Sequence, residues 1–242
     1  GRQLADYFDQ RADGSPAVSL RIWDALDQQL VAPFEYYASA DDTDLSKVRW
    51  HRGDGREDLD NVLSGDDVRA RAVINAIDHY LPRRDDMKAL AFCVSVRHAE
   101  FMARKFTEAG IPAVALSGDS TNEQRRDAPR DLASGRIRVV CTCDLYNEGV
   151  DLPEVNTLLF LRPTQSAVLF QQQLGRGLRL VAGKDACIVL DFVGLYRDDF
   201  RFDHLFQSVT GLSRKDLDHE VEHGFSRLPA GCHIQFDRVA KE

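Results

Sequence analysis

Two arginines and a glutamine lie close together in one short polar stretch. They follow the pattern Gln-x-x-Gly-Arg-x-x-Arg, which comprises Gln172, Gly175, Arg176 and Arg179. Residues three positions apart share one face of a helix, so we expect the two guanidiniums to point the same way. Two guanidiniums beside an amide can bind phosphate oxygens. Glycines at 175 and 177 would let another surface approach the backbone. The stretch predicts a phosphate clamp, although a solvated helix with two arginines would show the same pattern.

A second polar segment, from Thr142 to Pro153, follows an apolar run. Gly149 would permit the close approach of a nucleotide, and the Asp151 carboxylate can accept hydrogen bonds from ribose hydroxyls. The Thr142 hydroxyl can donate to a nucleic-acid phosphate. Asp144 has a simpler explanation as a helix cap. The segment therefore favours a nucleotide site beside a strand-binding hydroxyl.

Another hydroxyl, that of Ser95, follows an apolar run and begins a helical stretch. A hydroxyl, free backbone N–H groups and the positive end of a helix together suit a phosphate. An ordinary helix cap accounts for Ser95 equally well. We expect His98, three residues later, at the surface.

The next apolar run ends at Ser117 and Gly118, which we expect to face a nucleic-acid backbone. Thr121 with Gln124 forms a capping-box pattern, which is a sufficient structural explanation of the same loop. The arginines of the helix that follows alternate with aspartates at helical spacing, which is typical of a salt-bridged face.

Apolar runs alternate with helical stretches through the middle of the chain. The strands are expected at 89–94, 113–116, 137–141, 157–161 and 186–192. The helices are expected at 68–80, 97–109, 121–134 and 165–180. Near-continuous apolar strands between helices indicate an α/β fold with a parallel sheet covered on both faces. Ligands bind such sheets at the carboxyl ends of the strands, where these polar groups are expected.

The flanking segments carry weaker patterns. Residues 4–30 favour a helix broken once, and 31–37 a short strand. The acidic stretch 41–44 is expected to be a solvated loop or a helix cap. Helices are expected again at 198–206 and from Ser213. We divide the chain into an acidic connector with helix and strand (1–67), a central domain (68–195) and a helical C-terminal region (196–242).

The net charge of the 242 residues is −8, and it belongs to one segment. Residues 1–67 hold 7 Lys/Arg against 15 Asp/Glu, which argues against this segment as a nucleic-acid platform. No apolar run is long enough to span a bilayer, so no membrane role is expected. Five scattered cysteines suggest a reduced, cytoplasmic protein without a metal site. The first residues look like a cut inside a longer protein.

In order and spacing, the polar segments resemble the motifs of a known superfamily. Thr142–Pro153 and Gln172–Arg179 resemble motifs V and VI of superfamily 2 helicases, and Ala91–Ser95 resembles motif IV. The resemblance spans about 85–195 and identifies a second RecA-like domain. The flanks are similar to a bacterial subgroup of DEAD/DEAH-like helicases that carry a C-terminal region of unknown function and often a phospholipase-D-like nuclease domain.

This resemblance implies a two-domain ATPase motor that uses ATP and Mg²⁺ between two RecA-like domains and moves on nucleic acid. Arg176 and Arg179 would be arginine fingers, and Gln172 would lie near the phosphates or the attacking water. The nucleotide would lie against Gly149, Asp151 and Gly175. The strand backbone would contact Ser95, Arg97 and Thr142. Such helicases act in restriction and repair, which favours DNA over RNA by analogy.

Two elements of a complete ATPase site are missing from the sequence. No Gly-x-x-x-x-Gly-Lys-Ser/Thr loop and no Asp-Glu-x-His or Asp-Glu-Ala-Asp tetrad occurs in the 242 residues. We therefore expect the chain alone to bind ATP weakly and not to hydrolyse it; a first RecA-like domain of the same polypeptide would hold most of the nucleotide and Mg²⁺. An adaptor module that binds nucleic acid or protein without catalysis is the alternative. A dinucleotide-binding enzyme is disfavoured because no Gly-x-Gly-x-x-Gly follows a strand.

Overall fold

The computed structural model describes most of the chain. The described residues are 21–45, 48, 55–143, 152, 154–164, 166–195, 202–223, 225 and 228–236. Part of the helix expected at 4–30 lies outside them. Among the described residues, no helix has the length and apolar character that a membrane span requires.

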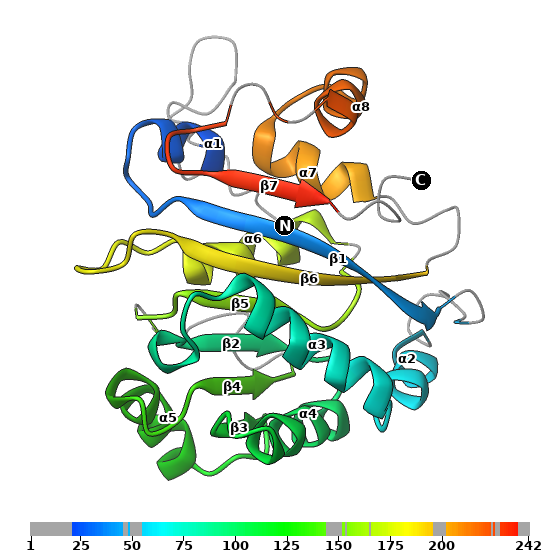
Figure 1. Cartoon of the computed structure of the whole chain (residues 1–242), viewed down its shortest axis with the longest axis vertical. Coiled ribbons are helices and arrows are strands. Elements are labelled where there is room, and N and C mark those ends of the chain that lie inside the picture. The colour runs from blue at the N-terminus through cyan, green and yellow to red at the C-terminus, as the bar shows by residue number, and fades with distance from the viewer. Residues whose placement is uncertain are drawn as a thin grey trace, which may run out of the picture.

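Seven parallel strands form one sheet, in the order β3-β4-β2-β5-β6-β1-β7 (Figure 1). The strands are β1 Phe34–Asp44, β2 Ala89–Phe92, β3 Ala113–Leu116, β4 Val139–Thr142, β5 Thr157–Phe160, β6 Cys187–Leu195 and β7 His233–Phe236. The five strands expected in the middle of the chain are all present, so the α/β fold with a parallel sheet is confirmed.

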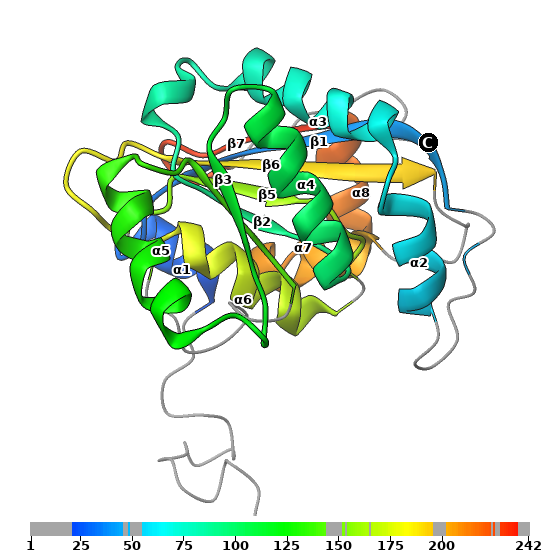
Figure 2. The ribbon, with the colours of Figure 1, turned by 90° about the horizontal axis from the view of Figure 1, so that it is seen from below.

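Helices cover both faces of this sheet (Figure 2). They are α1 Ile22–Asp27, α2 Gly55–Leu63, α3 Asp67–Tyr80, α4 Val96–Glu108, α5 Asn122–Ser134, α6 Ala167–Gly177, α7 Phe202–Thr210 and α8 Arg214–His223, with a short 3₁₀ helix, η2, at Arg84–Asp86. Buried side chains of α3 and α4 pack on one face, and those of α1, α5, α6, α7 and α8 pack on the other.

The central strands β2, β4 and β5 are almost entirely apolar because both of their faces are buried. In β2, Leu90 and Phe92 contribute to the core beneath α6 and α7, whereas Ala89 and Ala91 contribute to the core beneath α3 and α4. Successive side chains of a strand point to opposite faces, so each face needs its own set of apolar residues. This requirement explains the continuous apolar runs in the sequence.

Strand β1 is longer than the sequence pattern indicates. The expected strand ended at residue 37, and 41–44 was expected to be a loop or cap, but β1 pairs with β6 as far as Asp44 and Leu195, with an irregularity after Ala40. The loop prediction was wrong because pairing uses backbone groups, which acidic residues carry like any others. Strands β1 and β7 from the flanks extend the same sheet, and the domain limits stay a prediction.

The surface position expected for His98 was also wrong. This side chain is only 1% exposed, and the backbone N–H of Val94 donates to its Nδ1 at 3.3 Å. Nearby, the buried guanidinium of Arg69 donates to the carbonyls of Leu161 and Phe192, at 3.0 and 3.2 Å. Burial, and secondarily the charge of Arg69, lower the pKa of His98 from 6.5 to about 3, although Asp60 favours the charged form.

We predict that acid destabilises the fold through His98. Because the pKa of this group is lower in the folded state, protonation below pH 6.5 favours the unfolded chain. The free energy of unfolding therefore keeps falling until the pH reaches about 3. Between pH 7 and pH 4 the loss should be about 3 kcal/mol. A His98→Asn variant keeps an acceptor for Val94 and lacks this titration. Urea denaturation of both proteins at the two pH values measures the difference; equal losses of unfolding free energy would contradict the prediction.

Candidate functional site

Three expected strand-binding residues come together at the carboxyl edge of the sheet. Thr142, the last residue of β4, pairs in register with Phe92 of β2 and Leu116 of β3. Ser95 and Ser117 follow those two strands closely. Their proximity follows from the parallel sheet, in which neighbouring strands end at one edge.

The Thr142 hydroxyl is unusual among these groups. Its side chain is 1% exposed, and Oγ1 has no hydrogen-bond partner among the described residues, while the Thr142 carbonyl accepts from the Cys93 N–H at 2.8 Å. A buried hydroxyl without a partner costs free energy. The residue therefore retains an unused hydrogen-bonding group at the edge where a strand is expected.

The loop after β3 is satisfied within the protein. Ser117 Oγ accepts from the Asp119 N–H at 3.2 Å, and the Arg125 guanidinium donates to the Gly118 carbonyl. Thr121 and Gln124 form the expected capping box. The structural explanation of this loop is confirmed, and a strand contact at Ser117 and Gly118 stays a prediction.

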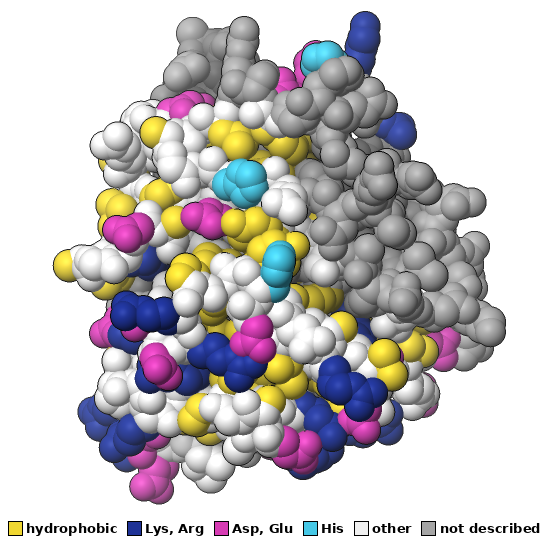
Figure 3. All heavy atoms as spheres, viewed as in Figure 1, with side chains coloured by type: hydrophobic (Ala, Val, Ile, Leu, Met, Phe, Trp, Pro, Cys, Tyr) yellow, Lys and Arg dark blue, Asp and Glu magenta, His cyan; other side chains and the backbone are white. Residues whose placement is uncertain are grey.

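Part of the salt-bridged face expected on α5 is present, because Arg126 and Arg130 pair with Asp127. Asp131 pairs instead with Arg136, which lies beyond the end of the helix. Figure 3 shows Lys and Arg over the lower half of one face of the molecule, with Asp and Glu interspersed among them. On this face a strand would find individual basic groups, not a continuous positive field.

Helix α6 carries the glutamine and the first arginine of the expected clamp. Gln172 is exposed and Arg176 is partly buried, but the helix ends at Gly177, so Arg179 lies beyond it. The prediction of one helix face for both arginines was wrong. Two glycines weaken the last turn, and Lys184 Nζ donates a hydrogen bond to the Gly177 carbonyl, which favours the end of the helix there.

The two glycines of this pattern have different surroundings. A Cβ on Gly175 would meet nothing within 4 Å, so this backbone is open to approach. A Cβ on Gly177 would collide with Cys187 Sγ and would lie 2.9 Å from Leu158 Cδ1. Gly177 thus lets α6 pack directly on β5 and β6.

This packing places Arg176 away from the hydroxyls that are expected to bind a strand. Leu158 and Cys187 are among the first residues of β5 and β6, so the end of α6 lies at the amino ends of these strands. Figure 1 shows α6 running back along the sheet in this sense. The sequence led us to expect all polar groups at the carboxyl edge, and for the arginines this was wrong because a crossover helix returns antiparallel to its strand.

Lys184 lies at this end of α6 and was not singled out from the sequence. Its Nζ donates to the Gly177 carbonyl at 2.8 Å and to the Val155 carbonyl at 3.0 Å. Burial, opposed by Cys187 and aided by Arg179, lowers the pKa of Lys184. Through these two hydrogen bonds the lysine connects the end of α6 to the segment that follows position 151. A single lysine in a turn gives no sequence signal of such a role.

Two expected nucleotide contacts, Gly149 and Asp151, lie outside the described residues. Val155 is described and lies four positions after Asp151, where Lys184 holds it. The chain therefore passes close to the end of α6 soon after the expected ribose contacts.

Part of this chain matches a known protein family. Residues 72–181 match the model of the helicase conserved C-terminal domain. A 51.5 kDa protein of a Lactococcus phage (isolate 7-9) is 31% identical over 190 residues, which are 78% of this chain and 40% of that protein. The endonuclease subunit of the type I restriction enzyme EcoKI of Escherichia coli (strain K12) is 29% identical over 140 residues, 52% of this chain and 12% of that subunit. The chain thus spans less than half the length of either relative.

A solved structure shares the fold. A fragment of a protein assigned as the HsdR subunit of a type I restriction enzyme from Vibrio vulnificus YJ016 has a TM-score of 0.61 and 17% identity, over 82% of this chain and 38% of that chain. This likeness establishes the RecA-like fold. The family match shows separately that residues 72–181 are a helicase conserved C-terminal domain, which corresponds to the second RecA-like domain of superfamily 2 helicases.

Proposed function

We propose that this chain is the C-terminal half of an ATP-dependent DNA helicase or translocase and supplies arginine fingers to a nucleotide held by a first RecA-like domain. The observation that supports this most directly is the end of α6. Gln172 is exposed there, Gly175 is open to approach, and Arg176 is positioned by a helix end packed directly on the sheet.

The chemistry of phosphoryl transfer explains why such an end is useful. Negative charge spreads over the γ-phosphate oxygens in the transition state, and an arginine that reaches them across a cleft accelerates transfer by about 10³–10⁵-fold. Arg176 and Arg179 would supply this charge, Gln172 would lie near the water or the phosphates, and Gly149, Asp151 and Gly175 would border the nucleotide. Fingers that are in place only when the two domains close would couple hydrolysis to movement.

Mg²⁺ would be held by the first RecA-like domain. Within the part of the chain that the structure describes, no group of three or more His, Cys, Asp or Glu side chains could hold a metal ion. The chain's own contribution would be positive charge and shape.

The strand would bind at the opposite end of the sheet, along Ser95, Arg97, Ser117, Gly118 and Thr142. The separation of this edge from the arginines suits a motor. In a motor, closure of the two domains around the nucleotide must change how tightly the strand is bound at a separate site. DNA is the favoured substrate because the Escherichia coli relative belongs to a restriction enzyme. We also propose that the chain comes from the bacterial helicase subgroup that often carries a nuclease domain, and that the protein is cytoplasmic.

The test is ATP turnover by this chain alone and mixed with a separately expressed first RecA-like domain, each with and without single-stranded DNA. We expect turnover only in the mixture, and stimulation by the strand. Turnover by the chain alone would reveal a complete site of its own. Absence of turnover in a mixture of two folded domains, together with tight strand binding, would favour a non-catalytic adaptor.

A further inference from the structure

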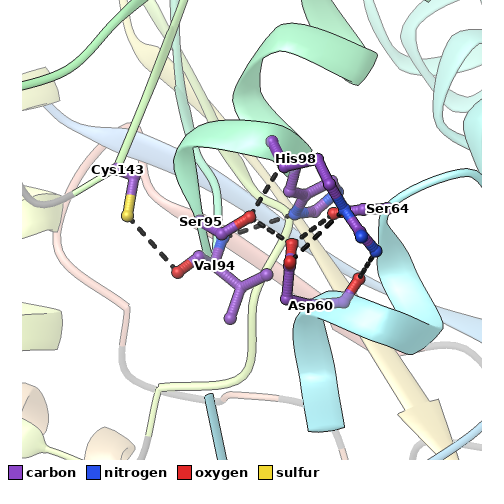
Figure 4. A network of polar contacts seen from close by, with 7 residues as sticks. Asp60, Ser64, Val94, Ser95, His98 and Cys143 are labelled. Atoms are coloured by element: carbon purple, nitrogen blue, oxygen red, sulfur yellow. Dashed lines mark hydrogen bonds and ion pairs between the residues drawn. The ribbon is translucent and has the colours of Figure 1, made fainter. Parts of the chain in front are cut away.

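One residue of α2, Asp60, lies on the proposed strand-binding edge. Its carboxylate accepts hydrogen bonds from Ser95 Oγ and Ser64 Oγ (Figure 4). Its Oδ2 lies 3.4 Å from Arg97 Nε. Arg97 Nη2 also donates to the Asp60 carbonyl at 3.3 Å. Two of the residues expected to hold a strand, Ser95 and Arg97, are thus both engaged by one acidic residue.

The groups around Asp60 are those that a phosphate oxygen would use. A serine hydroxyl, a guanidinium and the first turn of a helix all favour an anion. Partial burial raises the pKa of Asp60, but hydrogen bonds from Ser64 and Ser95 and the charge of Arg97 outweigh this effect and lower it. A carboxylate therefore occupies the environment that the strand backbone would need.

Helix α2 is attached by a small apolar contact of its own. Leu59 and Leu63 of α2 pack with Leu45 and Val48 against Val94, and this cluster is separate from the two cores beside the sheet. Releasing α2 would expose this cluster without opening either core. The cost of release is limited to the apolar contacts of these few side chains.

The connection from α2 to α3 is a short turn at Gly65. Gly65 has a φ of +111°, which residues other than glycine rarely adopt, and a Cβ there would meet nothing within 4 Å. Asp66 then caps α3 through the N–H groups of Val68 and Arg69, both at 3.0 Å. Helix α3 is thus capped independently of α2.

We propose that α2 is an autoinhibitory lid whose Asp60 carboxylate competes with a strand phosphate for Ser95 and Arg97. This inference rests on the strand-binding edge of the proposed function. Strand binding displaces the carboxylate, so part of the free energy of strand binding is used to undock α2, and the observed affinity is lower. The lid thus favours release of the strand whenever other contacts weaken.

The first test is the affinity of the 242-residue chain for fluorescein-labelled oligo-dT, measured by anisotropy. Asp60→Asn removes the charge and keeps the size, and the Kd should fall about fivefold, the factor set by one exposed charge contact. Glu57→Gln is the matched control, because it removes an equal charge from an exposed position of the same helix. Equal effects of the two substitutions, or no gain with Asp60→Asn, would reject the lid.

Arg97→Gln separates failure of the lid from failure of the strand-binding edge. If Arg97→Gln weakens binding by the otherwise unchanged chain while Asp60→Asn changes nothing, the edge is right and the lid is wrong. If neither substitution has an effect, the strand binds elsewhere and both proposals fail.

Hydrogen exchange of the unsubstituted chain tests the lid without a variant. Addition of oligo-dT should speed exchange of the α2 amides while those of α3 stay protected. Increased protection of α2 by the strand would contradict displacement.

Discussion

Replacing Arg179 with Ala is expected to reduce ATP turnover by about 10³–10⁵-fold in a protein that contains both RecA-like domains. The loss should appear in kcat, because the guanidinium acts on charge that develops in the transition state. Strand affinity should change little, since the proposed strand-binding edge lies at the opposite end of the sheet. Steady-state turnover and oligo-dT anisotropy measure the two effects.

Two further substitutions sharpen this test. Arg179→Lys keeps the charge but loses the planar fork, so most of the activity should still be lost. Arg130→Ala removes an arginine whose side chain is 70% exposed on α5 and should leave turnover unchanged. Turnover by Arg179→Ala within tenfold of the unchanged protein would show that Arg179 is no finger.

Replacing Gly177 with Ala should destabilise the domain by about 1–3 kcal/mol and also disable turnover. The new Cβ would collide with Cys187 Sγ and press on Leu158, so the end of α6 must move away from the sheet. Arg176 lies one residue earlier, and a shift of about 1 Å in a catalytic group can cost about 10²-fold in rate. Urea denaturation and steady-state turnover measure the two effects.

Gly175→Ala is the matched control, because a Cβ there meets nothing within 4 Å. It should raise stability by up to about 1 kcal/mol, as expected for Gly to Ala within a helix. If a nucleotide approaches Gly175, this variant loses turnover without losing stability. Equal stability of the Gly177 and Gly175 variants would contradict the packing account.

The strands and helices of the central region could be predicted from the sequence because the pattern of each element lies within a short window. Five apolar runs and the helices between them follow from periodicity, and the Thr121–Gln124 cap follows from spacing. The proximity of Ser95, Ser117 and Thr142 then follows from parallel pairing.

What could not be predicted depends on contacts between distant parts of the chain. The end of α6 is set partly by Lys184 and Cys187, and the burial of His98 by packing around the start of α4. Helix α2 is polar and short, and the position of Asp60 is set by contacts with Val94, Ser95 and Arg97, which lie more than 30 residues further along the chain. No pattern within a short window contains such information.

The measurement that tests the central claim most directly is the affinity between this chain and a separately expressed first RecA-like domain loaded with ADP, Mg²⁺ and fluoroaluminate. This ligand mimics the γ-phosphate in the transition state of phosphoryl transfer, so arginine fingers that contact it should strengthen the association of the two domains. We predict that affinity, measured by calorimetry, rises at least about tenfold over the ADP-loaded state, and that Arg176→Ala or Arg179→Ala removes the gain. An equal gain with both arginines replaced would contradict the arginine-finger account.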